Sequence, residues 1–167
     1  MTPVATIGTA VVSLPADDQI LITREFDAPK HLVYKAWTTP ELVSRWWSGK
    51  RGQMKVAEID LRVGGQWRYA MDAQGGFEVA FHGEYEEIVE NERLVYTEVF
   101  EGAPEAGATV NVVTFTEVDG RTHLESLTIC PSKEVRDLII GSGMEGGAQE
   151  GMDILEEIAI ELGRLDG

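Results

Sequence analysis

The chain has 167 residues and 43% hydrophobic content, which suits one globular domain with a single sizeable core. Its formal net charge of −15 argues against nucleic-acid and anionic-membrane partners, because both are recruited by clustered Lys and Arg side chains. We expect an acidic, well-solvated exterior around one domain over residues 1–167.

The cellular compartment is indicated by cysteine usage and by the start of the chain. Cys130 is the only cysteine, so no internal disulfide can form and a reducing, cytoplasmic compartment is expected. No apolar run approaches the roughly 20 residues of a membrane span. Residues 1–6 lack the basic start and long apolar stretch of a signal peptide, so we expect the N-terminus to be retained.

The first elements are predicted from alternation and from helix-start signals. Residues 1–17 form an N-terminal extension with a strand predicted over 4–14, and a second strand is predicted over 19–26. Asp27-Ala28-Pro29 resembles a helix start because proline is tolerated in the first turn. Thr39 precedes Pro40 as a plausible N-cap of a second short helix.

Period-two alternation then dominates the sequence up to residue 130. Strands are predicted over 54–60, 66–72, 77–89, 93–100, 109–118 and 122–130, separated by short turn-forming segments. Consecutive strands without intervening helices predict an antiparallel meander. The long strand 77–89 is expected to bend, and Gly83 in its middle is a natural bulge or bend site.

The C-terminal part is predicted to be helical. Ser132 can cap a short helix, and an apolar stripe at spacings of three and four begins at Met144. Gly143, Gly147 and Gly151 recur every four residues, although each interior glycine costs about 0.5–1 kcal/mol relative to alanine. Two explanations stay open: close packing of the helix on the sheet, or space left for a ligand.

Several stretches in this order resemble a known family. They lie at residues 26–29, 46–47, 64–68, 82–85, 91–95, 114–117, 119–122, 131–137 and 142–147. Together they resemble the SRPBCC superfamily (START-like, birch-pollen-allergen-like), in its branch of heat-shock protein 90 ATPase activator-like proteins of the bacterial single-domain type. The resemblance covers residues 18–163 and implies an α+β helix-grip fold, in which a curved antiparallel sheet wraps around a long C-terminal helix.

The resemblance also implies a cavity between the sheet and the C-terminal helix for a small hydrophobic molecule, such as a lipid, sterol or polyketide. Pockets of this kind are mostly apolar and aromatic with a few polar groups. The residues we expect to line the cavity are Trp46, Trp47, Trp67, Tyr69, Tyr96, Phe115, Met144 and Met152.

Little in the sequence indicates chemistry at that cavity. The histidines His31, His82 and His123 lack metal-ligand spacing, and no nucleophile elbow, phosphate loop or dinucleotide fingerprint occurs, so we expect no metal, cofactor or catalytic residue. His82 and Glu125 lie in predicted strands, and a register shift of one residue decides whether they face the cavity.

The sequence therefore favours non-catalytic ligand binding and leaves two alternatives open. One is an enzyme of the cyclase, aromatase or dehydratase type that uses His82 or Glu125 for proton transfer. The other is a chaperone-associated or self-association module, including a homodimer.

Overall fold

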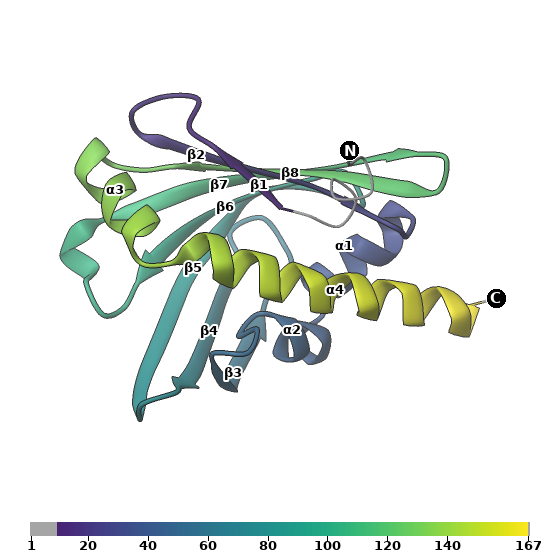
Figure 1. Ribbon diagram of the computed structural model, residues 1–167, viewed down its shortest axis with the longest axis horizontal. Coiled ribbons are helices and arrows are strands. Elements are labelled where there is room, and N and C mark those ends of the chain that lie inside the picture. The colour runs from purple at the N-terminus through teal and green to yellow at the C-terminus, as the bar shows by residue number, and fades with distance from the viewer. Residues whose placement is uncertain (1–9, 167) are drawn as a thin grey trace, which may run out of the picture.

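Eight strands form one antiparallel sheet in the order β1-β2-β8-β7-β6-β5-β4-β3, and the computed structural model describes residues 10–166 (Figure 1). The strands are β1 (Val11–Ser13), β2 (Gln19–Phe26), β3 (Gly52–Ile59), β4 (Gln66–Ala73), β5 (Phe77–Val89), β6 (Arg93–Phe100), β7 (Ala108–Val118) and β8 (Arg121–Ile129). Strands β3 to β8 are consecutive neighbours, so the predicted meander is confirmed.

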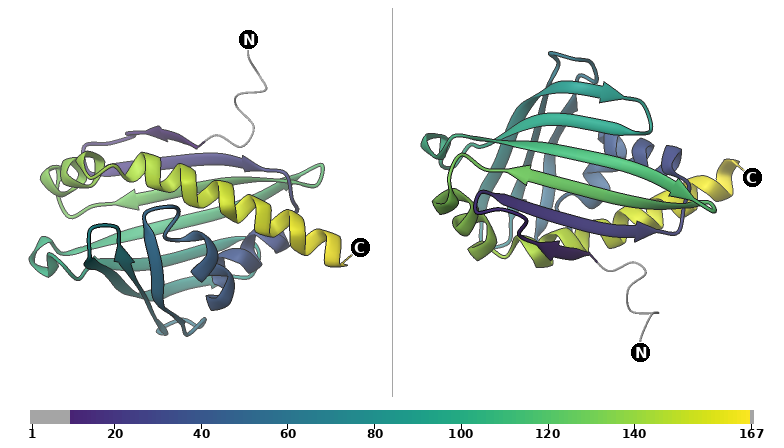
Figure 2. Two further views of the ribbon diagram at one scale, coloured as in Figure 1. Left: turned by 60° about the horizontal axis from the view of Figure 1, so that its bottom comes forward. Right: turned by 90° about the horizontal axis from the view of Figure 1, so that it is seen from above.

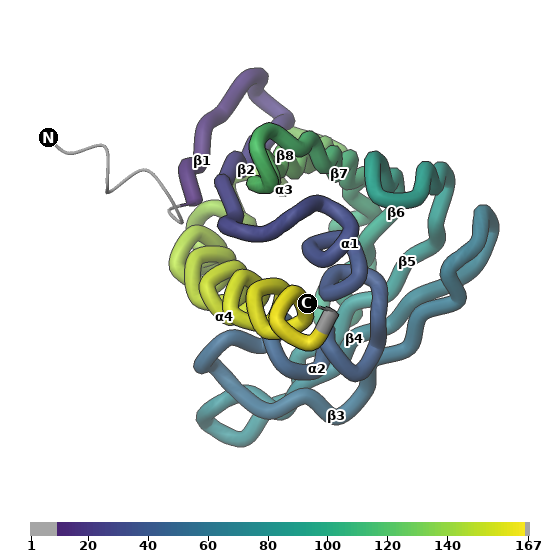
Figure 3. The backbone as a smooth tube through the Cα atoms, turned by 90° about the vertical axis from the view of Figure 1, so that its right-hand side faces the viewer, coloured from purple at the N-terminus to yellow at the C-terminus, as the bar shows by residue number. Residues whose placement is uncertain are grey.

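Four α-helices lie on the concave side of this sheet or at its end. They are α1 (Lys30–Thr38), α2 (Pro40–Trp46), α3 (Lys133–Gly141) and α4 (Met144–Asp166), and a 3-10 turn, η2 (Pro104–Ala106), joins β6 to β7. The sheet curves around α4, and α1 and α2 lie beside that helix (Figures 2 and 3). We call the sheet face toward these helices the inner face, and the opposite one the outer face.

The strand alternation seen in the sequence matches the observed burial. Along β2, partly exposed residues alternate with the buried residues Ile20, Ile22, Arg24 and Phe26. Along β7, Thr109, Asn111, Val113 and Phe115 alternate in the same way. These buried positions face the helices, because one face of an antiparallel sheet carries every second residue.

Two local expectations need revision. The predicted first strand is seen only as Val11–Ser13, and residues 4–9 lie outside the described part of the chain. Thr39 occupies the N-cap position of α2, but its side chain forms no cap hydrogen bond. By contrast, Ser132 caps α3 as predicted, since its hydroxyl accepts a hydrogen bond from the Val135 amide at 3.2 Å.

The irregularity in β5 has two parts. The β5–β6 register shifts between Tyr85 and Glu87, so the bulge falls past Gly83. At Gly83 itself the neighbouring strand approaches closely: a Cβ there would lie 1.8 Å from the Thr97 carbonyl oxygen. The Trp67 indole Nε1 donates to that carbonyl at 3.1 Å, beside the place where a side chain of residue 83 would stand. Glycine is required here by a close approach.

The glycine series of α4 packs on the segment that joins α2 to β3. A Cβ at Gly151 would lie 2.9 Å from the Trp46 carbonyl oxygen, and Cβ atoms at Gly146 and Gly147 would lie 2.9 Å and 3.5 Å from the Arg51 guanidinium. Both sequence-based explanations placed these glycines toward the sheet or a ligand. At Gly151 the absent side chain lets α4 approach the end of α2, because a Cβ there would meet the Trp46 backbone carbonyl.

Candidate functional site

Strand register decides which side chains reach the inner face. Tyr69 pairs with Phe81, Tyr85 with Tyr96, and Leu94 with Val113, and paired residues of an antiparallel ladder point to the same side. The inner face is therefore a continuous aromatic and aliphatic surface that runs across β4, β5, β6 and β7. Rings of β4 and β6 lie close together on it: Trp67 lies 4.7 Å from Tyr69 and 5.6 Å from Tyr96 between ring centroids.

All eight residues predicted to line a cavity lie on the inner side of the domain, in its core cluster or packed against it. Five are buried: Trp46, Trp67, Tyr69, Phe115 and Met152. The other three are partly exposed: Trp47, Tyr96 and Met144. Trp46 is fixed in place because its indole Nε1 donates to the Ala36 carbonyl at 2.9 Å.

The inner side divides into two regions. Near α1 and the C-terminal part of α4 the packing is complete, with Phe26, Leu94, Leu124 and Leu155 at 0% exposure. Toward the start of α4 the inner-face residues are partly exposed, and this region, which we call the open half, comprises Trp47, Phe81, Tyr96, Glu98, Phe100 and Met144. Its rings are contiguous, since Trp47 lies 5.5 Å and Phe100 lies 5.1 Å from Phe81.

Glu98 is the ionisable residue of the open half, and sequence analysis missed it. It shares the alternation of Leu94, Tyr96 and Phe100 and pairs with Thr109 on the inner face. Burial raises the pKa of the Glu98 carboxyl to about 7, and a hydrogen bond from Asn111 opposes that rise. The position in strand 93–100 was the signal that could have revealed it.

A short polar chain supports Glu98 from the neighbouring strands. Asn111 Nδ2 donates to Glu98 Oε1 at 3.2 Å, and Thr128 Oγ1 donates to Asn111 Oδ1 at 2.7 Å. Because Thr128 donates to the amide oxygen, the Asn111 amide must present its NH₂ group to the carboxyl. This orients one carboxyl oxygen of Glu98 within an otherwise aromatic region.

The tyrosines of the inner side stay neutral. Burial raises the pKa of Tyr69, Tyr85 and Tyr96, and the negative charge of Glu98 raises the pKa of Tyr69 and Tyr96 further. Their hydroxyl groups therefore act as hydrogen-bond donors and acceptors and carry no charge near neutral pH.

Helix α4 is tied to the sheet by a buried cation. Arg24, at 2% exposure, donates to Asp153 Oδ1 at 2.7 Å and to Glu156 Oε1 at 2.9 Å, and its guanidinium lies 4.9 Å from the Phe26 ring centroid. Because both carboxylates belong to α4, this cluster fixes where the helix crosses the inner face.

The two polar residues expected near the cavity lie elsewhere. His82 pairs with Arg68 and Glu125 pairs with Thr114, so the register places both on the outer face, where their side chains are about half exposed. The sequence left their register open, and the structure places them away from the inner face. Glu125 contacts His123 Nε2 at 3.1 Å, and Glu25 contacts the other ring nitrogen.

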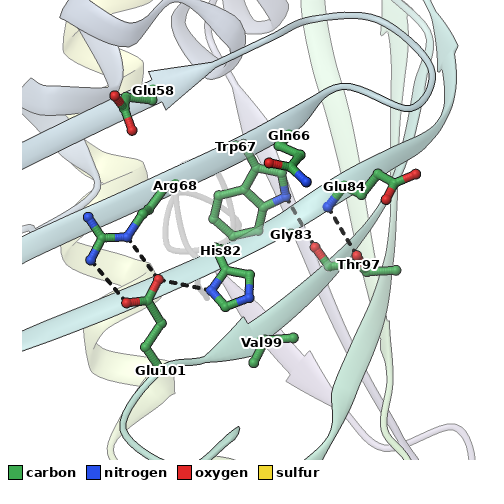
Figure 4. A pocket seen from close by; sticks show the side chains of 10 residues that line it. All are labelled: Glu58, Gln66, Trp67, Arg68, His82, Gly83, Glu84, Thr97, Val99 and Glu101. Carbon is green, nitrogen blue, oxygen red and sulfur yellow. Dashed lines mark hydrogen bonds and ion pairs between the residues drawn. The ribbon is translucent and has the colours of Figure 1, made fainter.

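A shallow hollow of about 520 Å³ lies on the outer face around His82 (Figure 4). Glu101 accepts two hydrogen bonds from Arg68 at 2.9 and 3.0 Å and contacts His82 Nδ1 at 2.9 Å. The pKa of the Glu101 carboxyl is lowered to about 2, and the hydrogen bonds from Arg68 are the largest cause. Trp67 lines this hollow as well, because Gly83 has no side chain to cover the indole.

Within residues 10–166 no group of three or more His, Cys, Asp or Glu side chains is arranged to hold a metal ion. None of the helices in that range combines the length and the apolar character needed to cross a membrane.

A curved antiparallel sheet around a long C-terminal helix defines the helix-grip class, in agreement with the α+β expectation. A family model described as activator of Hsp90 ATPase homolog 1-like protein matches residues 27–159. The chain therefore belongs to this family, which lies within the SRPBCC superfamily, and the resemblance read from the sequence is confirmed.

Solved structures of bacterial proteins share the fold. A Rhodobacter sphaeroides protein matches with a TM-score of 0.84 and 20% identity, over 91% of this chain and 99% of that one. A Nitrosomonas europaea protein matches with a TM-score of 0.80 and 22% identity, over 90% of this chain and 99% of that one. A Mycobacterium smegmatis protein matches with a TM-score of 0.81 and 24% identity, over 89% of this chain and 96% of that one. No curated protein matches the chain in sequence.

Proposed function

We propose that the protein binds a small, mainly apolar molecule at the open half, between the sheet and the start of α4, without catalysis. The observation that carries the proposal is the contiguous set of partly exposed rings there, with Phe100 at 41% exposure. Membership of a superfamily that commonly binds hydrophobic ligands supports it. A lipid, sterol or polyketide-like molecule suits such a surface.

The packing limits the size of such a ligand. Trp67 and Met152 fill the middle of the inner side, at 4% and 5% exposure. A ligand therefore rests on the open half and does not extend through the domain unless these side chains move. Met144 supports adaptable contact, because an unbranched thioether adjusts to differently shaped partners.

The enzymatic alternative requires proton transfer by His82 or Glu125. Both side chains lie on the outer face, so neither can transfer a proton to a molecule held on the inner face. This placement favours binding over the cyclase, aromatase or dehydratase alternative.

The experiment compares the protein as purified with two variants. Native mass spectrometry, compared with the denatured mass, shows whether a small molecule co-purifies with the protein. Tryptophan fluorescence then measures binding during titration with fatty acids, sterols and flavonoids. Ala148→Phe places a ring beside the open half, because Ala148 is partly buried against the core one helical turn from Met144. Ala108→Phe adds the same ring at an exposed position of β7.

We expect wild type and Ala108→Phe to bind with equal affinity, and Ala148→Phe to bind at least about tenfold more weakly, since a filled site loses its apolar contact area. Equal loss in both variants, or no response of the wild type to any ligand of the panel, would contradict the proposal.

A further inference from the structure

We propose that the ligand of the open half is an amphipathic organic amine, and that the Glu98 carboxylate is the counter-charge for its protonated nitrogen. This inference rests on the proposed function and names its ligand class. It requires a carboxylate that reaches the site, has a free oxygen and lacks a cation of its own. The structure meets each requirement.

Glu98 reaches the site by its place in β6. Tyr96 precedes it and Phe100 follows it on the same face of the strand, and both belong to the partly exposed aromatic surface. Across the ladder stands the buried Thr109. A molecule resting on the rings of Tyr96 and Phe100 would therefore lie directly against the carboxyl group.

One oxygen of Glu98 is held and the other is available. Oε1 accepts from Asn111, whose amide is itself oriented by Thr128. Oε2 takes part in no hydrogen bond or ion pair within the part of the chain that the structure describes. The side chain is thus positioned by the protein and presents one acceptor outward, as a group that orients a ligand must.

Glu98 also lacks a counter-charge among the described residues. The effects on its ionisation are burial and the Asn111 hydrogen bond, and no Lys, Arg or His contributes. Arg24, by contrast, is a buried charge with partners: it forms ion pairs with two carboxylates of α4, and its guanidinium lies over the Phe26 ring. A partly buried carboxylate without a cation is costly, so a cation supplied from outside is its natural complement.

Two features favour an amine over a neutral hydrogen-bonding ligand. The rings of Trp47, Phe81 and Phe100 form a contiguous surface next to the carboxyl, and aromatic faces attract organic cations. The net charge of −15 gives the whole molecule a potential that attracts cations and repels fatty acids. The favoured class is therefore an apolar ring or chain that bears a protonated amine.

The test uses three probes that share one naphthyl ring: 2-(1-naphthyl)ethylamine, 2-(1-naphthyl)ethanol and 1-naphthylacetate. Their affinities for wild type, Glu98→Gln and Glu98→Asp are measured by isothermal titration calorimetry at fixed ionic strength. Glu84→Gln is the matched control, since Glu84 is an exposed carboxylate of β5 on the outer face and its removal changes the net charge equally.

We expect the wild type to bind the amine about tenfold or more tightly than the alcohol, as a charge-assisted contact allows, and the carboxylate most weakly. In Glu98→Gln the amine should lose this preference while the alcohol keeps its affinity, and Glu98→Asp and Glu84→Gln should retain the preference. Glutamine can still accept from Asn111, so the variant should fold.

Two outcomes separate this inference from the proposed function. If the alcohol binds and the wild type shows no preference for the amine, or if the preference persists in Glu98→Gln, the amine proposal is wrong while ligand binding stands. If none of the three probes binds to the wild type, the open half fails as a binding site and both proposals fail together.

Discussion

Glu98 and Glu101 stand three positions apart in sequence, yet they lie on opposite faces of the sheet and their pKa values move in opposite directions. Burial raises the pKa of the inner Glu98 to about 7, whereas hydrogen bonds from Arg68 and His82 help lower that of the outer Glu101 to about 2. The same chemical group is a solvated partner in an ion pair on one face and an unpaired acid on the other.

This contrast shows where the protein tolerates an unfavourable arrangement. The outer charges are matched in pairs across the sheet: Arg93 of β6 reaches Glu87 of the neighbouring β5, and Lys55 of β3 reaches Glu78 of β5 across β4. Opposite charges on one face stabilise a sheet surface. The inner carboxyl accepts a hydrogen bond from the Asn111 amide and forms no ion pair with any of residues 10–166. Perturbed ionisable groups in a partly open apolar region are typical of functional sites, and this is the physical reason to look for a ligand there.

Gly83 lies against the backbone of β6, and its substitution should have the largest effect on stability. Gly83→Ala places a Cβ 1.8 Å from the Thr97 carbonyl oxygen, which is backbone and cannot move without shifting β6. We expect the free energy of unfolding to fall by about 3 kcal/mol, measured by urea denaturation. Gly141→Ala is the control, because nothing lies within 4 Å of its Cβ, and it should change stability by less than about 0.5 kcal/mol. An equal change in the free energy of unfolding of both variants would show that the β6 backbone at Thr97 can shift to accommodate the added methyl group.

Substitution of Arg24 tests whether charged side chains on the inner face need ion-pair partners. Arg24→Met keeps the apolar stem but leaves Glu156, whose side chain is 18% exposed, without its cation. We expect a loss of about 2 kcal/mol in the free energy of unfolding, because removing one partner of a buried pair leaves the other uncompensated. Arg45→Met is the matched control: its pair with Glu161 is about half exposed on both sides, and its loss should cost about 0.5 kcal/mol or less. Equal costs would remove the distinction between buried and exposed pairs here.

Glu98 should make stability fall as pH rises. Its pKa is raised from 4.5 to about 7 on folding, so the unfolded chain ionises first and stability is lost between those two pH values. Glu98→Gln removes this titration. We expect the variant to be more stable than wild type by about 1–2 kcal/mol at pH 8 and to show no such gain at pH 4.5, measured by urea denaturation at each pH. The control Glu84→Gln should show no gain at pH 8. A Glu98→Gln variant less stable at pH 8 would mean that the carboxylate already has a cation.

Much of the fold was predictable because its signals are local. The boundaries of 77–89 and 93–100 were predicted without error, since alternation and turn residues act over a few positions. The cap at Ser132 followed for the same reason. Thr39 shows the limit: residue type marked the position of the N-cap, but the rotamer that decides the hydrogen bond depends on neighbours distant in sequence.

For the candidate site, only the side of the domain on which the apolar residues lie was predictable. The aromatic residues were placed on the inner side because every second residue of a strand shares a face. His82 and Glu125 could not be assigned, since their orientation depends on register across strands far apart in sequence. Glu98 was overlooked because an acidic residue among apolar ones in a strand is ordinarily assigned to the solvent side, although its alternation with Tyr96 indicated otherwise.

Substitution of Glu101, the outer counterpart, should have the smallest effect on the free energy of unfolding. The pH dependence of that effect should have the opposite sign. Its pKa is lowered on folding from 4.5 to about 2, so the stability it contributes is present above pH 4.5 and is lost as pH falls toward 2. Glu101→Gln should reduce the free energy of unfolding by about 0.5–1 kcal/mol at pH 7, because its partners Arg68 and His82 are more than one-third exposed and screened by solvent.

Urea denaturation at pH 7 and pH 2.5, with and without 1 M NaCl, measures this effect. The deficit of Glu101→Gln should shrink at low pH and also in high salt, since both weaken exposed ion pairs. The gain of Glu98→Gln should persist in salt, because desolvation and not a distant charge is its first cause. If both variants responded to salt alike, the two carboxyls would share one electrostatic environment, and the sheet would not separate a paired outer charge from an unpaired inner one.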